Sequence, residues 1–390
     1  MRPLIPVAVL LRVAALTFFL PWRLAAEPLP TLESDAVVSG GSFPNFVVPL
    51  PDGSRYLAGD GFVLKLSPGG DVAWNRTVAD MVRGLAVDAS GNAYVAATDF
   101  SGPFARLYKF STSGELSGTV DLPINEADGE CCVFSGGVAV DPVRGRVYAA
   151  YNFGNPIGGN YNIKIAVLDT DLNILGVRIH SPEFMYGTGL IAKGGTFVDS
   201  QGDVWVAGYE SAGFPFSDNY VIVHHGPNLA GGILLRQEAI FIDGHNIVAA
   251  VDPRGGMVMS GEWSDENSFS PVRIRRVTAG GFAAYFIVED SDASLMTVDA
   301  AGSLYVLGGN PATFASAVIK LSTANERAWD SPHLDFPPER FPSALAIPAA
   351  GKLDVAGLEF DPNTFEIRGF VSRYTQGASS DTATPAAVSN

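Results

Sequence analysis

The stretch Gly84-Leu-Ala-Val-Asp-Ala-Ser-Gly-Asn-Ala-Tyr-Val-Ala-Ala97 recurs in weaker form along most of the 390-residue chain. It consists of an apolar run, an Asp-x-x-Gly turn and a second apolar run. The aspartate can accept hydrogen bonds from its own turn and the glycine supplies a positive φ, so each copy predicts a β-hairpin. The turn glycines of the seven copies are Gly53, Gly91, Gly145, Gly202, Gly255, Gly302 and Gly351. Their spacing of about 50 residues is typical of a repeat architecture.

A third apolar run follows each hairpin, and a fourth run ends most of the units, as in Asp71–Val78. Four antiparallel strands in roughly 40–50 residues describe one blade of a β-propeller. The sequence therefore predicts an all-β protein, a seven-bladed β-propeller of four-stranded antiparallel blades over about residues 35–374. The last unit has only three runs, and Asp35–Ser39 is a spare strand. We expect this N-terminal strand to close the ring by pairing with Gly369–Tyr374, because an unpaired edge invites aggregation.

The two ends of the chain are predicted to lie outside the propeller. A basic start, the apolar run Leu4–Leu20 and the small residues Ala25–Ala26 have the pattern of a secretory signal peptide over residues 1–26. A membrane anchor is the alternative, but the uninterrupted apolar stretch is shorter than the roughly 20 residues that span a bilayer. Residues 27–34 are expected to form a linker, and the polar residues 375–390 a disordered tail. The expected location is secreted or periplasmic.

The charge and composition of the chain exclude some classes of binding partner. Asp and Glu number 41 against 25 Lys and Arg, and the net charge of −16 argues against nucleic acid as a partner. The apolar share of 47% supports a large core, and no second run approaches the length of a membrane span. We expect a monomer whose partner is a protein, a glycan or a small-molecule ligand. The sequence indicates no particular cofactor.

The copy at 84–97 resembles the motif Gly-x-Ala-Val-Asp-x-x-Gly-Asn-x-Tyr-Val-x-Gly of a bacterial family of exported β-propeller repeat proteins. Partial matches at the other copies extend the resemblance over most of the chain. The resemblance implies an exported propeller built from repeats, and it implies no particular activity.

One face of the predicted ring supplies the candidate binding residues. Loops between second and third strands share a face, and the mouth of the central channel, with the connections between blades. Here those loops are long and rich in Gly, aromatic and acidic residues, so we expect the ligand site on this loop-rich face. The alternative is that the loops only fill the margins of the blades. The tight hairpin turns on the other face are expected to contribute little. The candidate ligand-binding residues are Arg83, Cys131, Cys132, Glu183, Lys193, His245, Glu262 and Trp263.

The only cysteines, Cys131 and Cys132, are adjacent in the predicted loop Ile124–Phe134. In an oxidising compartment they can pair within the chain only with each other. Such a disulfide needs a distorted peptide bond, and strain of this kind tends to mark functional loops. Two reduced thiols or a bridge between molecules are the alternatives.

The five histidines do not predict a metal site. Zinc or copper needs converging ligands, and the adjacent His224 and His225 point to opposite faces of their strand. His180 and His245 are expected in loops between blades, where they can approach the channel.

Two functions from different classes remain open. The first is an exported, non-catalytic propeller that binds its partner on the loop-rich face, since the sequence has no catalytic motif. The second is a propeller lyase or hydrolase with its site at the channel mouth. In that enzyme Arg83 and Lys193 would bind an anion, and Glu183 or His245 would serve as acid or base.

Overall fold

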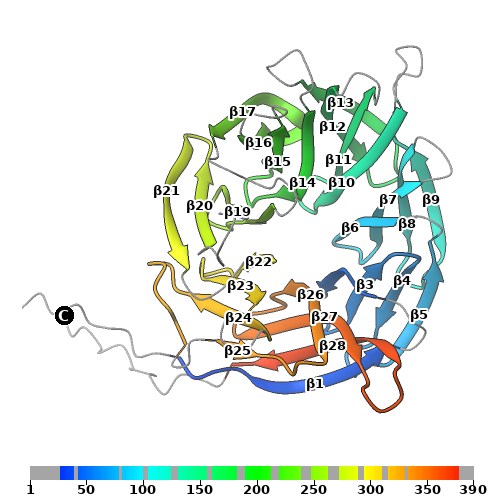
Figure 1. Ribbon diagram of the computed structural model, residues 1–390. Coiled ribbons are helices and arrows are strands. Elements are labelled where there is room, and N and C mark those ends of the chain that lie inside the picture. The colour runs from blue at the N-terminus through cyan, green and yellow to red at the C-terminus, as the bar shows by residue number, and fades with distance from the viewer. Residues whose placement is uncertain are drawn as a thin grey trace, which may run out of the picture.

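Seven antiparallel blades stand around a ring, as the sequence predicts (Figure 1). The computed structural model describes residues 27–38, 43–78, 81–99, 104–123, 131–155, 160–181, 189–211, 219–238, 247–261, 272–288, 294–309, 315–329 and 333–376. Five blades are separate four-stranded sheets, and blades 3 and 4 join through a parallel bridge between Tyr161 and Gly189. No helix within the described ranges has the length and apolar character needed to cross a membrane.

The strands follow one another in chain order, four to a blade, from the inside of the ring outward. Blades 1 and 2 contain β2 (Phe46–Pro49), β3 (Arg55–Gly59), β4 (Phe62–Leu66), β5 (Val72–Thr77), β6 (Met81–Val87), β7 (Ala93–Asp99), β8 (Phe104–Phe110) and β9 (Leu116–Asp121). Blades 3 and 4 contain β10 (Cys131–Asp141), β11 (Arg146–Asn155), β12 (Asn160–Asp169), β13 (Ile174–His180), β14 (Gly189–Val198), β15 (Val204–Ser211), β16 (Asn219–Gly226) and β17 (Ala230–Glu238). Blades 5 and 6 contain β18 (Val248–Val251), β19 (Met257–Gly261), β20 (Val272–Thr278), β21 (Gly281–Val288), β22 (Leu295–Val298), β23 (Leu304–Gly309), β24 (Ser316–Leu321) and β25 (Leu334–Asp335).

The seventh blade is completed by the N-terminal strand, which confirms the predicted closure. Its strands are β26 (Arg340–Ala346), β27 (Lys352–Phe360), β28 (Ile367–Thr375) and β1 (Thr31–Val38). β1 pairs antiparallel with β28, with Asp35 opposite Ser372. The strand begins at Thr31, so it takes in part of the stretch expected to be a linker.

The repeated turn motif forms hairpins through the bonds that its residues predict. In blade 2, Asp88 Oδ1 accepts the backbone N–H groups of Ser90 and Asn92, each at 2.9 Å. Gly91 takes the positive φ, +82°. The second carboxylate oxygen accepts a 3.0 Å hydrogen bond from the Tyr94 hydroxyl. In blade 2 the turn aspartate thus also holds the first buried aromatic side chain of the following strand in place.

The core lies between the facing sheets of neighbouring blades. Side chains alternate along each strand, so successive residues of β11 enter two different cores. Val147 and Ala149 pack with blade 2, whereas Tyr148 and Ala150 pack with blade 4. Each blade is therefore stabilised by burial against both of its neighbours.

Candidate ligand groove between blades 3 and 4

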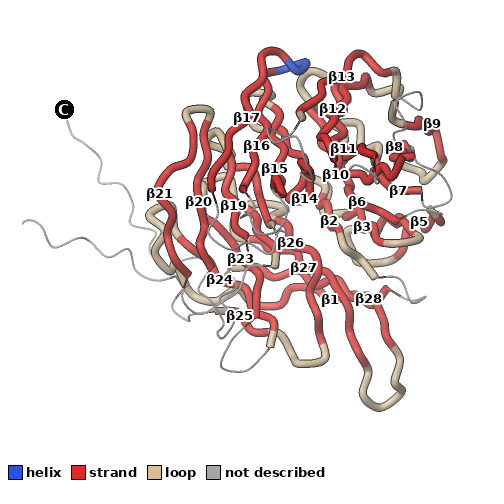
Figure 2. Tube along the Cα trace, turned by 45° about the horizontal axis from the view of Figure 1, so that its top comes forward, coloured by secondary structure: helices blue, strands red, loops and turns tan. Residues whose placement is uncertain are grey.

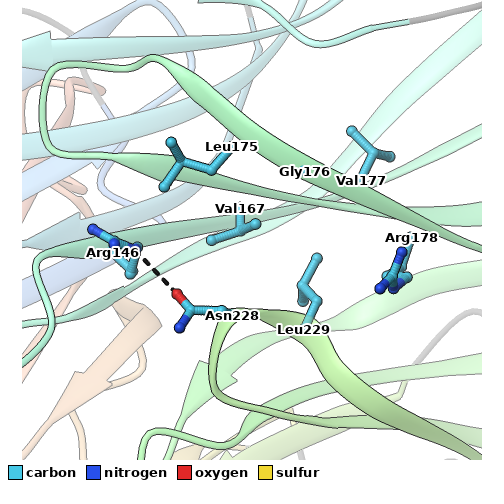
Figure 3. A pocket seen from close by; sticks show the side chains of 8 residues that line it. All are labelled: Arg146, Val167, Leu175, Gly176, Val177, Arg178, Asn228 and Leu229. Atoms are coloured by element: carbon cyan, nitrogen blue, oxygen red, sulfur yellow. Dashed lines mark hydrogen bonds between the residues drawn. The ribbon is translucent and has the colours of Figure 1, made fainter.

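A groove of about 390 Å³ opens between β13, the outermost strand of blade 3, and the turn between β16 and β17 of blade 4. This turn contains η2 (Pro227–Leu229), the short helical turn in Figure 2. Figure 3 shows the residues that line the groove: Arg146, Val167, Leu175, Gly176, Val177, Arg178, Asn228 and Leu229. Arg146 directly follows the tight hairpin turn of its blade. The groove therefore lies on the face of tight turns, from which the sequence led us to expect little.

The two ends of the groove are cationic and its middle is apolar. Arg146 and Arg178 lie on opposite sides in Figure 3, with Val167 and Leu229 between them. Arg146 donates hydrogen bonds to backbone carbonyl groups and to the Asn228 side chain, with Nε 3.1 Å from Oδ1. Within the described residues neither arginine forms an ion pair with a carboxylate. Asp169, opposite Arg146 on β12, offsets part of its charge at longer range, and the remaining positive charge of the two arginines can attract an anion.

The blade 4 turn is held in a strained shape where it meets the groove. Asn228 and Leu229 are consecutive left-handed residues, with φ of +56° and +58°. This conformation costs roughly 1–2 kcal/mol for each residue that carries a Cβ. The buried Tyr148 hydroxyl accepts the backbone N–H of Asn228 at 3.0 Å, and Leu229 is buried against blade 3. Contacts across the blade junction therefore fix the turn, and such strain is common at functional sites.

Two histidines meet beside the groove. His180, the last residue of β13, approaches His225 of β16, with the two Nε2 atoms 2.8 Å apart. The expectation that His180 lies in a loop between blades is wrong, because β13 stays paired with β12 as far as His180. Burial, and then the neighbouring His225, lower the pKa of His180 to about 4. Burial also lowers the pKa of His225, and the charge of Arg178 adds to this effect.

The neighbouring His224 points the other way, as predicted from its place on the strand. Its ring stacks on Trp205 with 4.0 Å between ring centroids. Its Nε2 atom lies 2.9 Å from Asp203 Oδ2. His224 and His225 thus belong to different environments and cannot bind one ion together.

Half of the eight candidates predicted on the loop-rich face lie outside the described residues. Glu183, His245, Glu262 and Trp263 are in this group. Arg83 is described: it is exposed on β6, and its Nη2 atom lies 3.5 Å from the Met81 sulfur. Lys193 lies in a bulge of β14, where the structure describes the backbone only. The described residues do not test whether these candidates lie close together, and their binding role stays a prediction.

Cys131 and Cys132 open the innermost strand of blade 3 instead of lying in a loop. Cys131 pairs with Gly154 of β11. The loop expectation is wrong because β10 and β11 are long strands, of 11 and 10 residues, and keep pairing beyond the apolar run of the repeat. The thiol groups are outside the described part of the structure, so the vicinal disulfide stays a prediction.

Replacing both cysteines with serine is expected to change the melting temperature by less than about 2 °C, because so short a covalent loop restricts little unfolded-chain entropy. Differential scanning calorimetry measures this, and mass spectrometry without reductant tests the bridge itself. If protein taken from an oxidising compartment contained two alkylatable thiols, the predicted disulfide would be refuted.

Comparison with known proteins supports the fold alone. No family model matches the sequence, and no curated protein is significantly similar to it. Among solved structures, the chain is similar to the hydrazine synthase of Kuenenia stuttgartiensis, with a TM-score of 0.56, 12% identity and coverage of 88% of this chain and 97% of that one. It is similar to the polysaccharide lyase Uly1, with a TM-score of 0.56, 8% identity and coverage of 88% and 99%. It also matches half of the chain of prolyl oligopeptidase B from Galerina marginata, with a TM-score of 0.54, 10% identity and 87% of this chain covered. The protein is a seven-bladed β-propeller.

Proposed function

We propose that this protein is an exported, non-catalytic binding propeller that takes an anionic ligand with an apolar middle in the groove between blades 3 and 4. The observation that supports it is the pair Arg146 and Arg178, neither of which forms an ion pair with a carboxylate among the described residues of a chain with a net charge of −16. An arginine fork binds a carboxylate through two parallel hydrogen bonds. The aliphatic residues between the arginines suit an apolar ligand body.

The size and lining of the groove favour binding over catalysis. Its volume of about 390 Å³ falls in the range of small-molecule sites. The lining residues are two arginines, one asparagine, one glycine and four aliphatic residues. None of them is a nucleophile or changes its protonation near neutral pH, as a general acid or base must. The enzyme alternative stays a prediction from the sequence and rests on Arg83, Glu183, Lys193 and His245.

Three probes of equal chain length separate the charge of the ligand from its apolar body: nonanedioate, nonanoate and nonan-1-ol. Isothermal titration calorimetry is expected to rank their affinities in that order, with about a 10-fold step for each carboxylate, or 1.4 kcal/mol. Arg146→Gln and Arg178→Gln are each expected to lower the affinity for nonanedioate by about 10-fold. Arg368→Gln is the matched control, because Arg368 lies on β28 and pairs with Asp361 and Glu366. Equal affinity for nonanedioate and nonan-1-ol, or no effect of either groove variant, would refute the proposal.

A further inference from the structure

We infer that His180 and His225 form a binding site for a divalent transition metal, Zn²⁺ or Cu²⁺, at the junction of blades 3 and 4. The two rings come from different blades and direct their Nε2 atoms at each other across 2.8 Å. Neutral imidazole nitrogen is a preferred ligand of both metals. The inference does not depend on the ligand groove.

One of the two rings is already oriented as in a metal site. His225 Nδ1 lies 2.9 Å from the carbonyl oxygen of Gly231. Since a carbonyl only accepts hydrogen bonds, Nδ1 carries the proton and Nε2 carries a lone pair directed at His180. Metal-binding histidines almost always donate their other ring N–H in this way, and the contact fixes the tautomer and the ring orientation.

The backbone of β17 makes room for this ring. Gly232 has a φ of +153°, and a Cβ there would lie 2.6 Å from His225 Cε1. Glycine at this position therefore lets the strand pass close behind the imidazole. His225 is only 2% exposed, while His180 is half-buried, so solvent reaches the pair from the His180 side.

Metal binding needs one change of tautomer and no net loss of protons. In the metal-free pair, His180 Nε2–H donates to His225 Nε2. Moving that proton to His180 Nδ1 gives two lone pairs that face one point. Zinc–nitrogen bonds of about 2.0–2.1 Å place two tetrahedral ligands about 3.3 Å apart, so the rings must separate by about half an ångström. Within the described residues no group of three or more His, Cys, Asp or Glu side chains converges, so the two histidines are the ligands that this part of the chain supplies.

One nearby charge opposes the metal and makes the inference testable. Arg178 lies on β13, the strand that also carries His180, and its positive charge acts on His225 of β16. Arg178→Ala is therefore expected to raise the affinity for the metal a few-fold. The same substitution is expected to lower the affinity of the groove for an anion. The opposite signs distinguish failure of this site from failure of the proposed function.

The test is a calorimetric titration of the full chain, without a polyhistidine tag, with Zn²⁺. We expect one site, and a loss of affinity of at least about 10-fold in His180→Gln and in His225→Gln. His224→Gln is the matched control, because His224 is adjacent in sequence but faces Trp205. Circular dichroism checks the fold of each variant.

A measurement on the unmodified protein guards against variants that fail to fold. Electron paramagnetic resonance of the Cu²⁺-loaded chain is expected to show two equivalent imidazole nitrogen ligands. No Zn²⁺ binding, unchanged affinity in folded His180→Gln, or a copper spectrum without two nitrogen ligands would each overturn the site and leave a simple hydrogen bond between blades.

Discussion

Removal of β1, by deletion of residues 27–38, is expected to make the protein aggregate. The deletion uncovers the edge of β28 along its whole paired length, and an exposed strand edge is a template for association. It also removes Asp35, whose carboxylate accepts hydrogen bonds from Ser372 and Arg340 at 2.6 and 2.5 Å. Burial of Val38 and the charged hydrogen bonds of Asp35 together contribute about 5 kcal/mol. Light scattering and thermal unfolding measure the two effects.

Adjacent point variants on β1 show whether the strand acts through the packing of its inner face. Val38 is 2% exposed and Val37 is 50% exposed. We expect Val38→Ala to lower the free energy of unfolding by about 2 kcal/mol and Val37→Ala by less than about 0.5 kcal/mol. A deletion variant that stays monomeric with an unchanged melting temperature would mean that β1 does not close the ring.

Asp354→Ala is expected to lower the free energy of unfolding by about 3–5 kcal/mol, because it leaves buried arginines without their carboxylate. Asp354 on β27 is fully buried and accepts two 2.7 Å hydrogen bonds from the Arg373 guanidinium. Arg55 of blade 1 lies 3.9 Å from the same carboxylate and is 1% exposed. Arg373 also donates to the carbonyl of Gly53 in blade 1. This cluster therefore joins the last blade to the first.

A surface pair on the same blade is the control for Asp354. Glu366 pairs with Arg368, and its side chain is 62% exposed. Exposed ion pairs contribute about 0–1 kcal/mol, so Glu366→Ala is expected to have little effect on unfolding by urea. If Asp354→Ala lost no more stability than Glu366→Ala, the buried cluster would not stabilise the closure.

The fold was predictable because its signals are local and repeated. Each hairpin is specified within about 14 residues by its aspartate, its glycine and the flanking apolar runs, and seven copies fix the number of blades. The closing strand could be inferred from a missing fourth strand in the last unit. In each case the pattern marks the centre of the structural element, although strands such as β1 extend beyond it.

The groove and the histidine pair were not predictable in the same way. They join outer strands and turns of two blades, and the fourth strand of a blade has only a weak apolar pattern. The segment from Gly226 to Gly232 is rich in turn-forming residues, which was the available signal for an unusual turn. Nothing in that segment shows that Asn228 contacts Arg146, because that contact depends on how the two blades pack.

The closing strand also sets the order in which this protein can mature. Asp35 and Ser372 are 337 positions apart, so β1 is synthesised among the first strands and finds its partner only when the last blade exists. Bringing ends so distant together costs roughly 5 kcal/mol of chain entropy. During synthesis the ring therefore stays open between the first blade and the last until β28 has been made. A ribosome product truncated before β28 can never close, and cellular proteases can distinguish it from the complete ring by its free edges.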